Sequence, residues 1–244
     1  MLKLENIVWT APEGDKILRG VNLTVPTGKL TVVTGPNGGG KTSLAKIIAG
    51  VLTADSGKIL LDGEDITGLD VTERAKKGVA YAFQQPVRFK GLTVRDLLEL
   101  SGGGTIEETA LCRVLGAVGL CAKDYIDREV NASLSGGEIK RIEIATVLAR
   151  RDARLCLFDE PEAGIDLWSF SGLIDAFERL RKERNRTLLI ISHQERILNI
   201  ADEIIVIADG EVRAAGPREE VLPGLMAEEK GCRCPLRKEE TCRE

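Results

Sequence analysis

Residues 35–42 read Gly35-Pro36-Asn37-Gly38-Gly39-Gly40-Lys41-Thr42, which fits the pattern G-x-x-x-x-G-K-[S/T]. An apolar run at 30–34 predicts a strand before this loop, and apolar residues at helical spacing between 44 and 51 predict a helix after it. Glycines let backbone N–H groups surround phosphate oxygens, and the helix directs its positive end toward the same charges. The motif therefore predicts a nucleotide-phosphate site in which Lys41 reaches the terminal phosphates and Thr42 binds Mg²⁺.

The composition of the 244-residue chain is that of a core-forming protein, because 43% of its residues are hydrophobic and 30% are charged. Its net charge of −4 argues against a protein that coats nucleic acid, which usually has a basic excess. No apolar run approaches the ~18–20 residues that cross a bilayer, and the first residues lack the pattern of a signal peptide. We therefore expect a cytoplasmic protein that does not itself span a membrane.

Short apolar runs alternate with helical patterns along most of the chain, which predicts an α/β fold with a mostly parallel sheet. The predicted strands cover residues 2–9, 21–25, 30–34, 57–63, 78–83, 155–158, 187–191 and 203–208. Between residues 93 and 128, leucine and valine recur at helical spacing, so we interpret this segment as a helical insertion. A further helix is predicted over 168–184, and residues 226–244 are expected to form a loosely ordered tail.

A second motif, Leu155-Cys156-Leu157-Phe158-Asp159-Glu160, ends an apolar strand in two carboxylates. Carboxylates beside a buried strand are costly unless they are used. The carboxyl end of a parallel strand also lies at the same sheet edge as the phosphate loop. Asp159 is therefore a candidate for the Mg²⁺ shell, and Glu160 is a candidate for polarising the attacking water. A solvated strand end is the alternative interpretation.

A third motif, Leu134-Ser135-Gly136-Gly137-Glu138, precedes a helix and has the layout of a second anion-binding site. Taken alone, it also fits a capped helix start with a glycine turn. If the helical insertion holds this motif away from the first phosphate site, the two sites can meet only across two chains.

Together the three motifs resemble the ATP-binding-cassette (ABC) ATPases over residues 1–216, and residues 134–138 match the signature of that family almost letter for letter. The resemblance implies a P-loop NTPase fold with a RecA-like, mostly parallel sheet, an antiparallel β region and a helical subdomain inserted at about 90–130. It leaves residues 217–244 as a C-terminal helix or tail. It also implies that the chain binds ATP and Mg²⁺, hydrolyses ATP to ADP and phosphate, and forms a head-to-tail, ATP-dependent homodimer.

The resemblance assigns further residues to the site. Gln84 falls where the Q-loop glutamine of the family contacts Mg²⁺ and the attacking water, with Gln85 as the register alternative. Asp166 falls in the D-loop, and His193, the only histidine, falls where the switch histidine senses the γ-phosphate. The implied catalytic residues are Glu160, His193 and Gln84, and the implied metal ligands are Thr42, Gln84 and Asp159. The implied nucleotide contacts are Gly35, Pro36, Asn37, Gly38, Gly39, Gly40, Lys41, Thr42, Ser43, Leu134, Ser135, Gly136, Gly137, Glu138 and Asp166.

One family feature is missing from the sequence. Transporter ATPases commonly stack an aromatic side chain on adenine, and the corresponding position here holds Ala11. Trp9 lies two residues earlier on the same strand face, where packing in the core is the alternative. We therefore expect adenine to be held loosely.

A finer resemblance points to the SufC group, the ATPases of iron–sulfur cluster assembly. Residues 135–143, 162–166 and 193–198 are similar to the SufC pattern, whose members favour Lys-Arg after the signature. Pro161 departs from that pattern and has the general cassette form. The resemblance implies a SufB-like scaffold, alone or with a SufD-like protein, as the partner that ATP-driven closure rearranges. The alternative function is the nucleotide-binding subunit of an ABC membrane transporter.

A partner groove is expected beside the Q-loop, because cassettes transmit their closure there. Residues 85–89 are expected to line the groove, with Leu92 and Val94 nearby. Valine and phenylalanine beside arginine form a mixture that is typical of a docking hot spot.

The six cysteines fall into two groups. Cys112, Cys121 and Cys156 are scattered and are predicted to be small buried hydrophobic residues. The tail contains Cys232, Cys234 and Cys242, which either bind zinc or iron or remain free thiols. Three thiolates are one ligand short of a closed tetrahedral site.

Overall fold

The computed structural model describes residues 1–85, 87–131, 133–183 and 185–230. Its centre is a six-stranded sheet with the strand order β10-β9-β3-β8-β7-β6. The strands are β3 (Leu30–Thr34), β6 (Val79–Ala82), β7 (Leu155–Asp159), β8 (Thr187–Ile191), β9 (Glu203–Ala208) and β10 (Glu211–Pro217). All neighbouring strands run parallel except β9 and β10, which pair antiparallel. The predicted mostly parallel sheet is confirmed.

The central strands are buried on both faces, and alternate residues of each strand face different cores. In β7, Leu155 and Leu157 pack on the side of α1 (Lys41–Ala49). Phe158 packs on the opposite side, where its ring centroid lies 4.9 Å from that of Phe177 in α7 (Leu167–Glu183). Strands covered on both faces need continuous apolar runs, which explains the pattern that predicted them.

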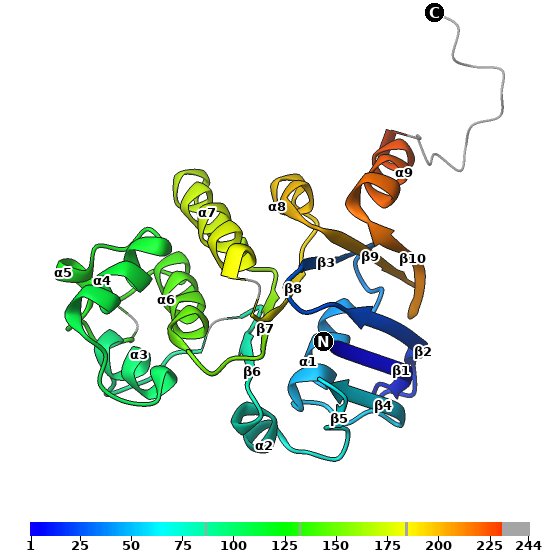
Figure 1. The fold of residues 1–244 in the computed structure, drawn as a ribbon, viewed down its shortest axis with the longest axis horizontal. Helices are drawn as coiled ribbons and strands as arrows, with labels where there is room; N and C mark the ends of the chain where they lie inside the picture. Colours follow the sequence, from blue (N-terminus) through cyan, green and yellow to red (C-terminus); the bar gives the residue numbers. More distant parts are fainter. Residues whose placement is uncertain (86, 132, 184, 231–244) are drawn as a thin grey trace, which may run out of the picture.

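A four-stranded antiparallel sheet packs on α1 from the side opposite the central sheet (Figure 1). Its strands, in spatial order, are β2 (Lys16–Val25), β1 (Leu2–Thr10), β4 (Ser56–Leu61) and β5 (Glu64–Asp65). Trp9 of β1 is partly buried against the core formed by this sheet and α1. Packing in the core was the alternative to a role for Trp9 beside adenine. The helix that follows the phosphate loop is therefore enclosed between two sheets.

The predicted helical insertion forms a separate lobe at one end of the molecule (Figure 1). The lobe contains α3 (Val94–Gly102), α4 (Glu108–Ala117) and α5 (Ala122–Tyr125) from the predicted insertion, together with α6 (Gly136–Ala149), which lies beyond its predicted end. Both α3 and α6 begin with a capping box, in which an N-cap hydroxyl and an acidic residue three positions later satisfy each other's backbone N–H groups. These caps fix where the helix after the third motif begins.

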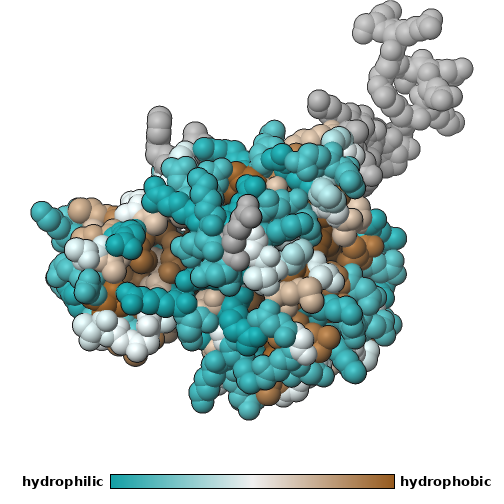
Figure 2. Space-filling model, in the orientation of Figure 1, coloured by the Kyte–Doolittle hydropathy of each residue, from teal (hydrophilic) through white to brown (hydrophobic). Residues whose placement is uncertain are grey.

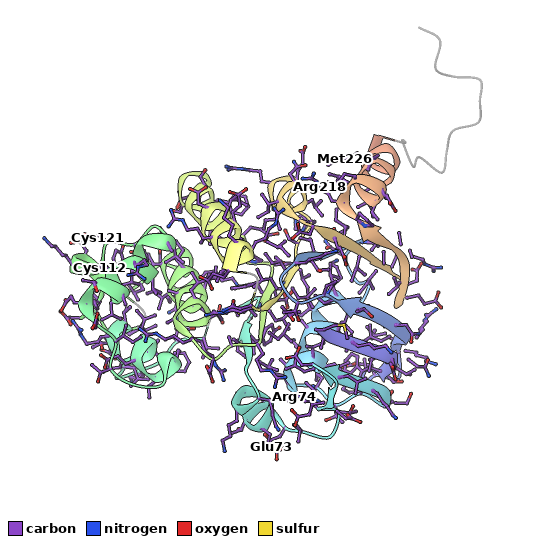
Figure 3. The ribbon with its side chains drawn as sticks, in the orientation of Figure 1. Glu73, Arg74, Cys112, Cys121, Arg218 and Met226 are labelled. Atoms are coloured by element: carbon purple, nitrogen blue, oxygen red, sulfur yellow. The ribbon has the colours of Figure 1, made fainter. Side chains whose placement is uncertain are left out.

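The remaining helices are α2 (Val71–Lys76), α8 (Glu195–Ile200) and α9 (Arg218–Lys230). Arg74 anchors α2, because its buried guanidinium donates to the backbone carbonyls of Ile47, Ile48 and Thr67. Figure 3 shows Arg74 and Glu73 on this short helix at the edge of the molecule. No helix in the described part of the chain is both long and apolar enough to span a bilayer.

Some sequence expectations are wrong in detail. Cys112 and Cys121 are exposed on the outer end of the helical lobe (Figure 3), and only Cys156 of the three scattered cysteines is buried. Val94, expected near the partner groove, is fully buried in the core. The helix α9 extends to Lys230, into the segment expected to be loosely ordered. The cysteines at 232, 234 and 242 lie outside the described residues.

Candidate functional site

Four adjacent parallel strands, β3, β8, β7 and β6, end at one edge of the central sheet. The segments at these ends are, in spatial order, the loop 35–40, Ser192-His193, Asp159-Glu160 and Phe83-Gln84. The fold therefore brings all the predicted strand-end residues to the edge where ligands of open α/β sheets bind.

The phosphate loop needs its glycines for steric reasons. Gly35 has a φ of 133°, and a Cβ there would lie 2.0 Å from the carbonyl oxygen of Ile207. Gly40, the residue before α1, has a φ of 98°. A side chain at either position would be strained. The loop backbone can therefore approach a ligand closely, as the motif predicts.

Lys41 points its ammonium into the loop. Its Nζ donates to the carbonyl oxygens of Gly35 and Pro36 at 2.8 and 2.9 Å. The side chain is only 7% exposed, and burial lowers the pKa of Lys41, although the carboxylates of Glu160 and Asp159 oppose that shift. The lysine is thus a positive charge held beside the loop and close to two carboxylates.

Asp159 and Thr42 form the candidate metal position. Thr42 Oγ1 donates to Asp159 Oδ1 at 3.3 Å, and the Tyr81 hydroxyl donates to Oδ2 at 3.1 Å. Asp159 is fully buried, and burial raises the pKa of its carboxyl. A hydroxyl and a carboxylate are hard oxygen donors, which is the kind of ligand that Mg²⁺ prefers. The donor set therefore fits the metal that the sequence predicts.

Gln84 and Glu160 are in direct contact, because Gln84 Nε2 donates to Glu160 Oε2 at 2.7 Å. Gln85 is exposed. Glu160 itself has a φ of 46°, in the left-handed region, and its N–H donates to the carbonyl of Ile191 at 2.9 Å. Non-glycine residues in this region are uncommon and cluster at functional sites.

His193 follows β8 and is exposed at the same edge. Its neighbours in the chain are Ser192, which is fully buried, and Gln194, which is exposed. Ser192 Oγ donates to Glu162 Oε1 at 2.6 Å, and the same hydroxyl accepts the Gln194 N–H at 3.0 Å. The histidine is therefore carried on a loop whose backbone is tied, through Ser192, to the segment that follows Asp159 and Glu160.

The third motif forms the N-terminus of α6. Ser135 Oγ accepts the Glu138 N–H at 3.2 Å, and Glu138 Oε2 accepts the Ser135 N–H at 2.7 Å. Hydrogen bonds from the Tyr125 hydroxyl and from Ser135 lower the pKa of Glu138 to about 2. Within the described residues, no hydrogen bond joins 134–138 to the loop 35–42. Across the residues that the structure describes, the motif is thus a capped helix start with no hydrogen bond to the phosphate loop of the same chain.

The D-loop segment lies against this motif in the same chain. A Cβ on Gly137 would lie 2.6 Å from the carbonyl oxygen of Gly164. Asp166 accepts the Ser169 N–H at 3.0 Å, near the start of α7. The predicted nucleotide contacts of the chain are therefore divided between two places. One is the phosphate loop, and the other is formed by the third motif together with the D-loop segment that lies against it.

The sequence analysis missed a buried ion pair behind the site. Lys140 is 1% exposed, and its Nζ donates to the backbone carbonyls of Phe83, Gln84 and Asp159. Glu143 Oε1 accepts the Phe83 N–H at 3.0 Å, and its Oε2 lies 3.6 Å from Lys140 Nζ. Burial lowers the pKa of Lys140 and raises the pKa of Glu143 to about 7. The sequence signal for this pair is a Lys and a Glu spaced i, i+3 on a helix that also carries Glu138 and Arg141, so the spacing does not single out the buried pair.

Comparison with known proteins gives consistent matches. The profile of a family described as ABC transporter matches residues 18–163. An uncharacterized ABC transporter ATP-binding protein of Methanocaldococcus jannaschii is 38% identical over 214 residues, 84% of this chain and 85% of that protein. A probable branched-chain amino acid transport ATP-binding protein, LivG, of Archaeoglobus fulgidus is 31% identical over 225 residues, 86% of this chain and 87% of that protein.

Among solved structures, a dimeric ATP-binding cassette in a post-hydrolysis state, bound to ADP and phosphate, superposes with a TM-score of 0.80. The two chains are 24% identical, and the match covers 89% of this chain and 99% of that one. This likeness establishes the fold. The predicted P-loop NTPase architecture, with its antiparallel β region and helical subdomain, is therefore confirmed.

Proposed function

The chain belongs to the ABC transporter ATPase family and is an ATPase, and from this premise we propose how its residues act on ATP. One copy holds ATP and Mg²⁺ with residues 35–43, and a second copy closes the site with residues 134–138. The cassette covers about residues 1–216. The observation that carries the proposal is the contact of Gln84 with Glu160 beside the contact of Thr42 with Asp159. These pairs lie at the sheet edge into which the phosphate loop opens.

Each residue has a role that follows from its place. Lys41 binds the terminal phosphates, since its ammonium already lies inside the loop. Thr42, Asp159 and Gln84 hold Mg²⁺, which when bound neutralises charge on the phosphates. Glu160 accepts a hydrogen bond from the attacking water and polarises it.

Two further residues are assigned to the γ-phosphate, and a third is assigned to the dimer interface. His193 faces the γ-phosphate from the end of β8, next to the loop. Ser135, from the second copy, contacts it across the interface, and Asp166 lies at the same interface. Ser135 and Gly136 are exposed at the N-terminus of α6, so that end of the helix is accessible to a second chain. The similar solved cassette is dimeric, which supports a head-to-tail dimer here.

Replacing Glu160 by glutamine tests this proposal. Glu160→Gln keeps the shape of the side chain and removes the charge that polarises water, so steady-state ATP turnover should fall by about 10²-fold or more while ATP binding is retained. With ATP and Mg²⁺ the variant should elute as a dimer in size-exclusion chromatography and as a monomer without nucleotide. Turnover equal to that of the unmodified protein would remove Glu160 from the reaction.

A cleft between the lobes is the proposed docking place of a separate partner. It measures about 820 Å³ and lies between α2, α3, α6 and β6, where the surface in Figure 2 is hollowed. Val71 on one wall is 47% exposed and Leu100 on the other is 69% exposed. Tyr81 and Phe83 line its floor and connect it to Asp159 and to the Lys140–Glu143 pair. A partner seated there would contact residues bonded directly to the site.

For the partner itself, a membrane permease is the proposal that the relatives support better, because both reported relatives are described as ATP-binding proteins of transporters. The chain would then work on the cytoplasmic face of a membrane. A SufB-like scaffold is the second candidate. It rests on the resemblance of residues 135–143, 162–166 and 193–198 to the SufC pattern. Cell fractionation separates the candidates, since a permease retains the chain in the membrane fraction and a scaffold does not.

A further inference from the structure

Glu162 lies behind His193 and makes a contact that the roles assigned above do not use. Its Oε1 accepts the hydroxyl of Ser192 at 2.6 Å, and Ser192 is fully buried. The same hydroxyl accepts the N–H of Gln194 at 3.0 Å. Because these two bonds flank His193, they fix the backbone turn from which the imidazole projects.

The second oxygen of Glu162 is unused in the described structure. Oε2 is buried and has no hydrogen-bond partner. A buried acceptor without a partner is costly, so its presence calls for an explanation. Burial raises the pKa of Glu162, and the nearby His193 imidazole acts in the opposite direction. The imidazole is therefore close enough to interact with the charge of Glu162, and its ring N–H is a hydrogen-bond donor of the kind that this oxygen lacks.

The two segments are also joined through their backbones. The N–H of Glu160 donates to the carbonyl of Ile191 at 2.9 Å, directly before the Ser192 contact. β7 and β8 are adjacent parallel strands, so their ends remain in register. A displacement of the Glu162 side chain would therefore be passed to the turn at His193 through Ser192.

We propose that Glu162 is a positioning residue for His193. Oε1 holds the Ser192 hydroxyl and so sets the turn. Oε2 accepts one imidazole N–H when the ring faces the nucleotide, which leaves the other ring nitrogen directed at the γ-phosphate. Orientation of a histidine by a carboxylate on its second nitrogen is a general device. The inference rests on the proposed role of His193 in ATP hydrolysis.

Steady-state kinetics of two substitutions test the inference. Glu162→Ala should lower kcat by about tenfold and leave KM for ATP within about twofold, because it disturbs orientation and not nucleotide binding. Glu162→Gln keeps one acceptor for Ser192 and should lose only about threefold. Glu203→Ala is the control, since Glu203 is half-buried and pairs with Lys29 at the opposite end of the sheet. Circular dichroism and the thermal midpoint establish that each variant is folded.

Two further measurements separate positioning from a structural effect. In a His193→Ala background, Glu162→Ala should cause no additional loss of kcat, because it acts through the missing imidazole. His193 is the only histidine in the chain, so on tag-free protein its imidazole ¹⁵N resonances report on it alone. These resonances should shift in Glu162→Gln and stay unchanged in Glu203→Ala.

The outcomes distinguish failure of the inference from failure of the proposed function. Losses that multiply in the double variant, or imidazole resonances that do not move in Glu162→Gln, would overturn the positioning role while ATP hydrolysis stands. If His193→Ala turns over ATP as fast as the unmodified protein, the assigned role of His193 fails first.

Discussion

Asp159 is a fully buried carboxylate whose side-chain partners are two hydroxyl groups, those of Thr42 and Tyr81. Hydroxyl groups satisfy hydrogen bonds but do not neutralise the charge, and burial raises the pKa of this carboxyl. A divalent cation supplies the charge that the carboxylate needs. Asp159 should therefore affect nucleotide binding through the metal.

Replacing Asp159 by asparagine tests this dependence on metal. Asp159→Asn keeps the shape of the side chain and removes its charge, so ATP affinity in EDTA should change little. The gain in affinity on adding Mg²⁺ should fall by at least about tenfold. Binding of a fluorescent ATP analogue with and without Mg²⁺ measures both quantities. Tyr81→Phe is the matched control, because it removes a bond to Asp159 without removing a proposed metal ligand. A full Mg²⁺ response in Asp159→Asn would exclude this residue from the metal site.

At the scale of elements, α6 connects the helical lobe to the catalytic edge. Ser135 caps its N-terminus, and Lys140 and Glu143 on the same helix hold the backbone before Gln84 and at Asp159. A shift of α6 would therefore change the backbone on both sides of the Gln84–Glu160 contact. The ion pair that makes this connection is buried and so costs desolvation energy.

Substitutions of the pair should separate its cost from its role. Lys140→Met alone leaves Glu143 buried without its cation and should lower the free energy of unfolding by about 3 kcal/mol or more. The double variant Lys140→Met/Glu143→Gln should recover most of that stability. Its kcat should nevertheless remain low, because the carbonyls of Phe83 and Asp159 lose their shared donor. Urea denaturation and steady-state kinetics measure the two effects. A double variant with full activity would show that the pair serves stability alone.

The same pair predicts a dependence of stability on pH. Burial raises the pKa of Glu143 from its ordinary 4.5 to about 7, so the folded chain binds this proton more tightly than the unfolded chain. The protonated carboxyl of Glu143 therefore contributes to the free energy of unfolding at low pH, and this contribution is lost as the pH rises from about 4.5 to about 7. Relative to the unmodified protein, the double variant should gain unfolding free energy between pH 5 and 7.5. Urea denaturation across this range measures it, and parallel curves for the two proteins would contradict the prediction.

At the scale of the whole molecule, the sheet and the strand-end motifs could be predicted from local sequence. Strands buried on both faces carry unbroken apolar runs, and a phosphate loop is defined by residues that adjoin in the chain. Helices of six residues, such as α2 and α8, are too short for periodicity to detect. The exposure of Cys112 and the burial of Lys140 depend on which helix faces meet. Such contacts join residues far apart in sequence, and no local pattern records them.

The cleft between the lobes gives the prediction that concerns the whole assembly. Leu100 on its wall is 69% exposed. Phe89, which follows the Q-loop and is not among the residues that line the cleft, is 42% exposed. An aspartate at either position remains hydrated in the free chain but is buried without a partner in a complex. Leu100→Asp and Phe89→Asp should therefore abolish co-purification of the partner from native cells while leaving ATP binding intact. Ala214→Asp, at an exposed position on the edge strand β10, is the control.

The identity of the captured protein then decides between the two proposed partners. A membrane-embedded permease recovered with the unmodified chain and with Ala214→Asp, and lost with Leu100→Asp, supports transport. Recovery of a SufB-like protein from the soluble fraction in the same pattern supports the scaffold. If neither aspartate weakens capture, the partner does not dock in the cleft, and the connection from Tyr81 and Phe83 to Asp159 and Lys140 cannot be the route by which ATP closure reaches it.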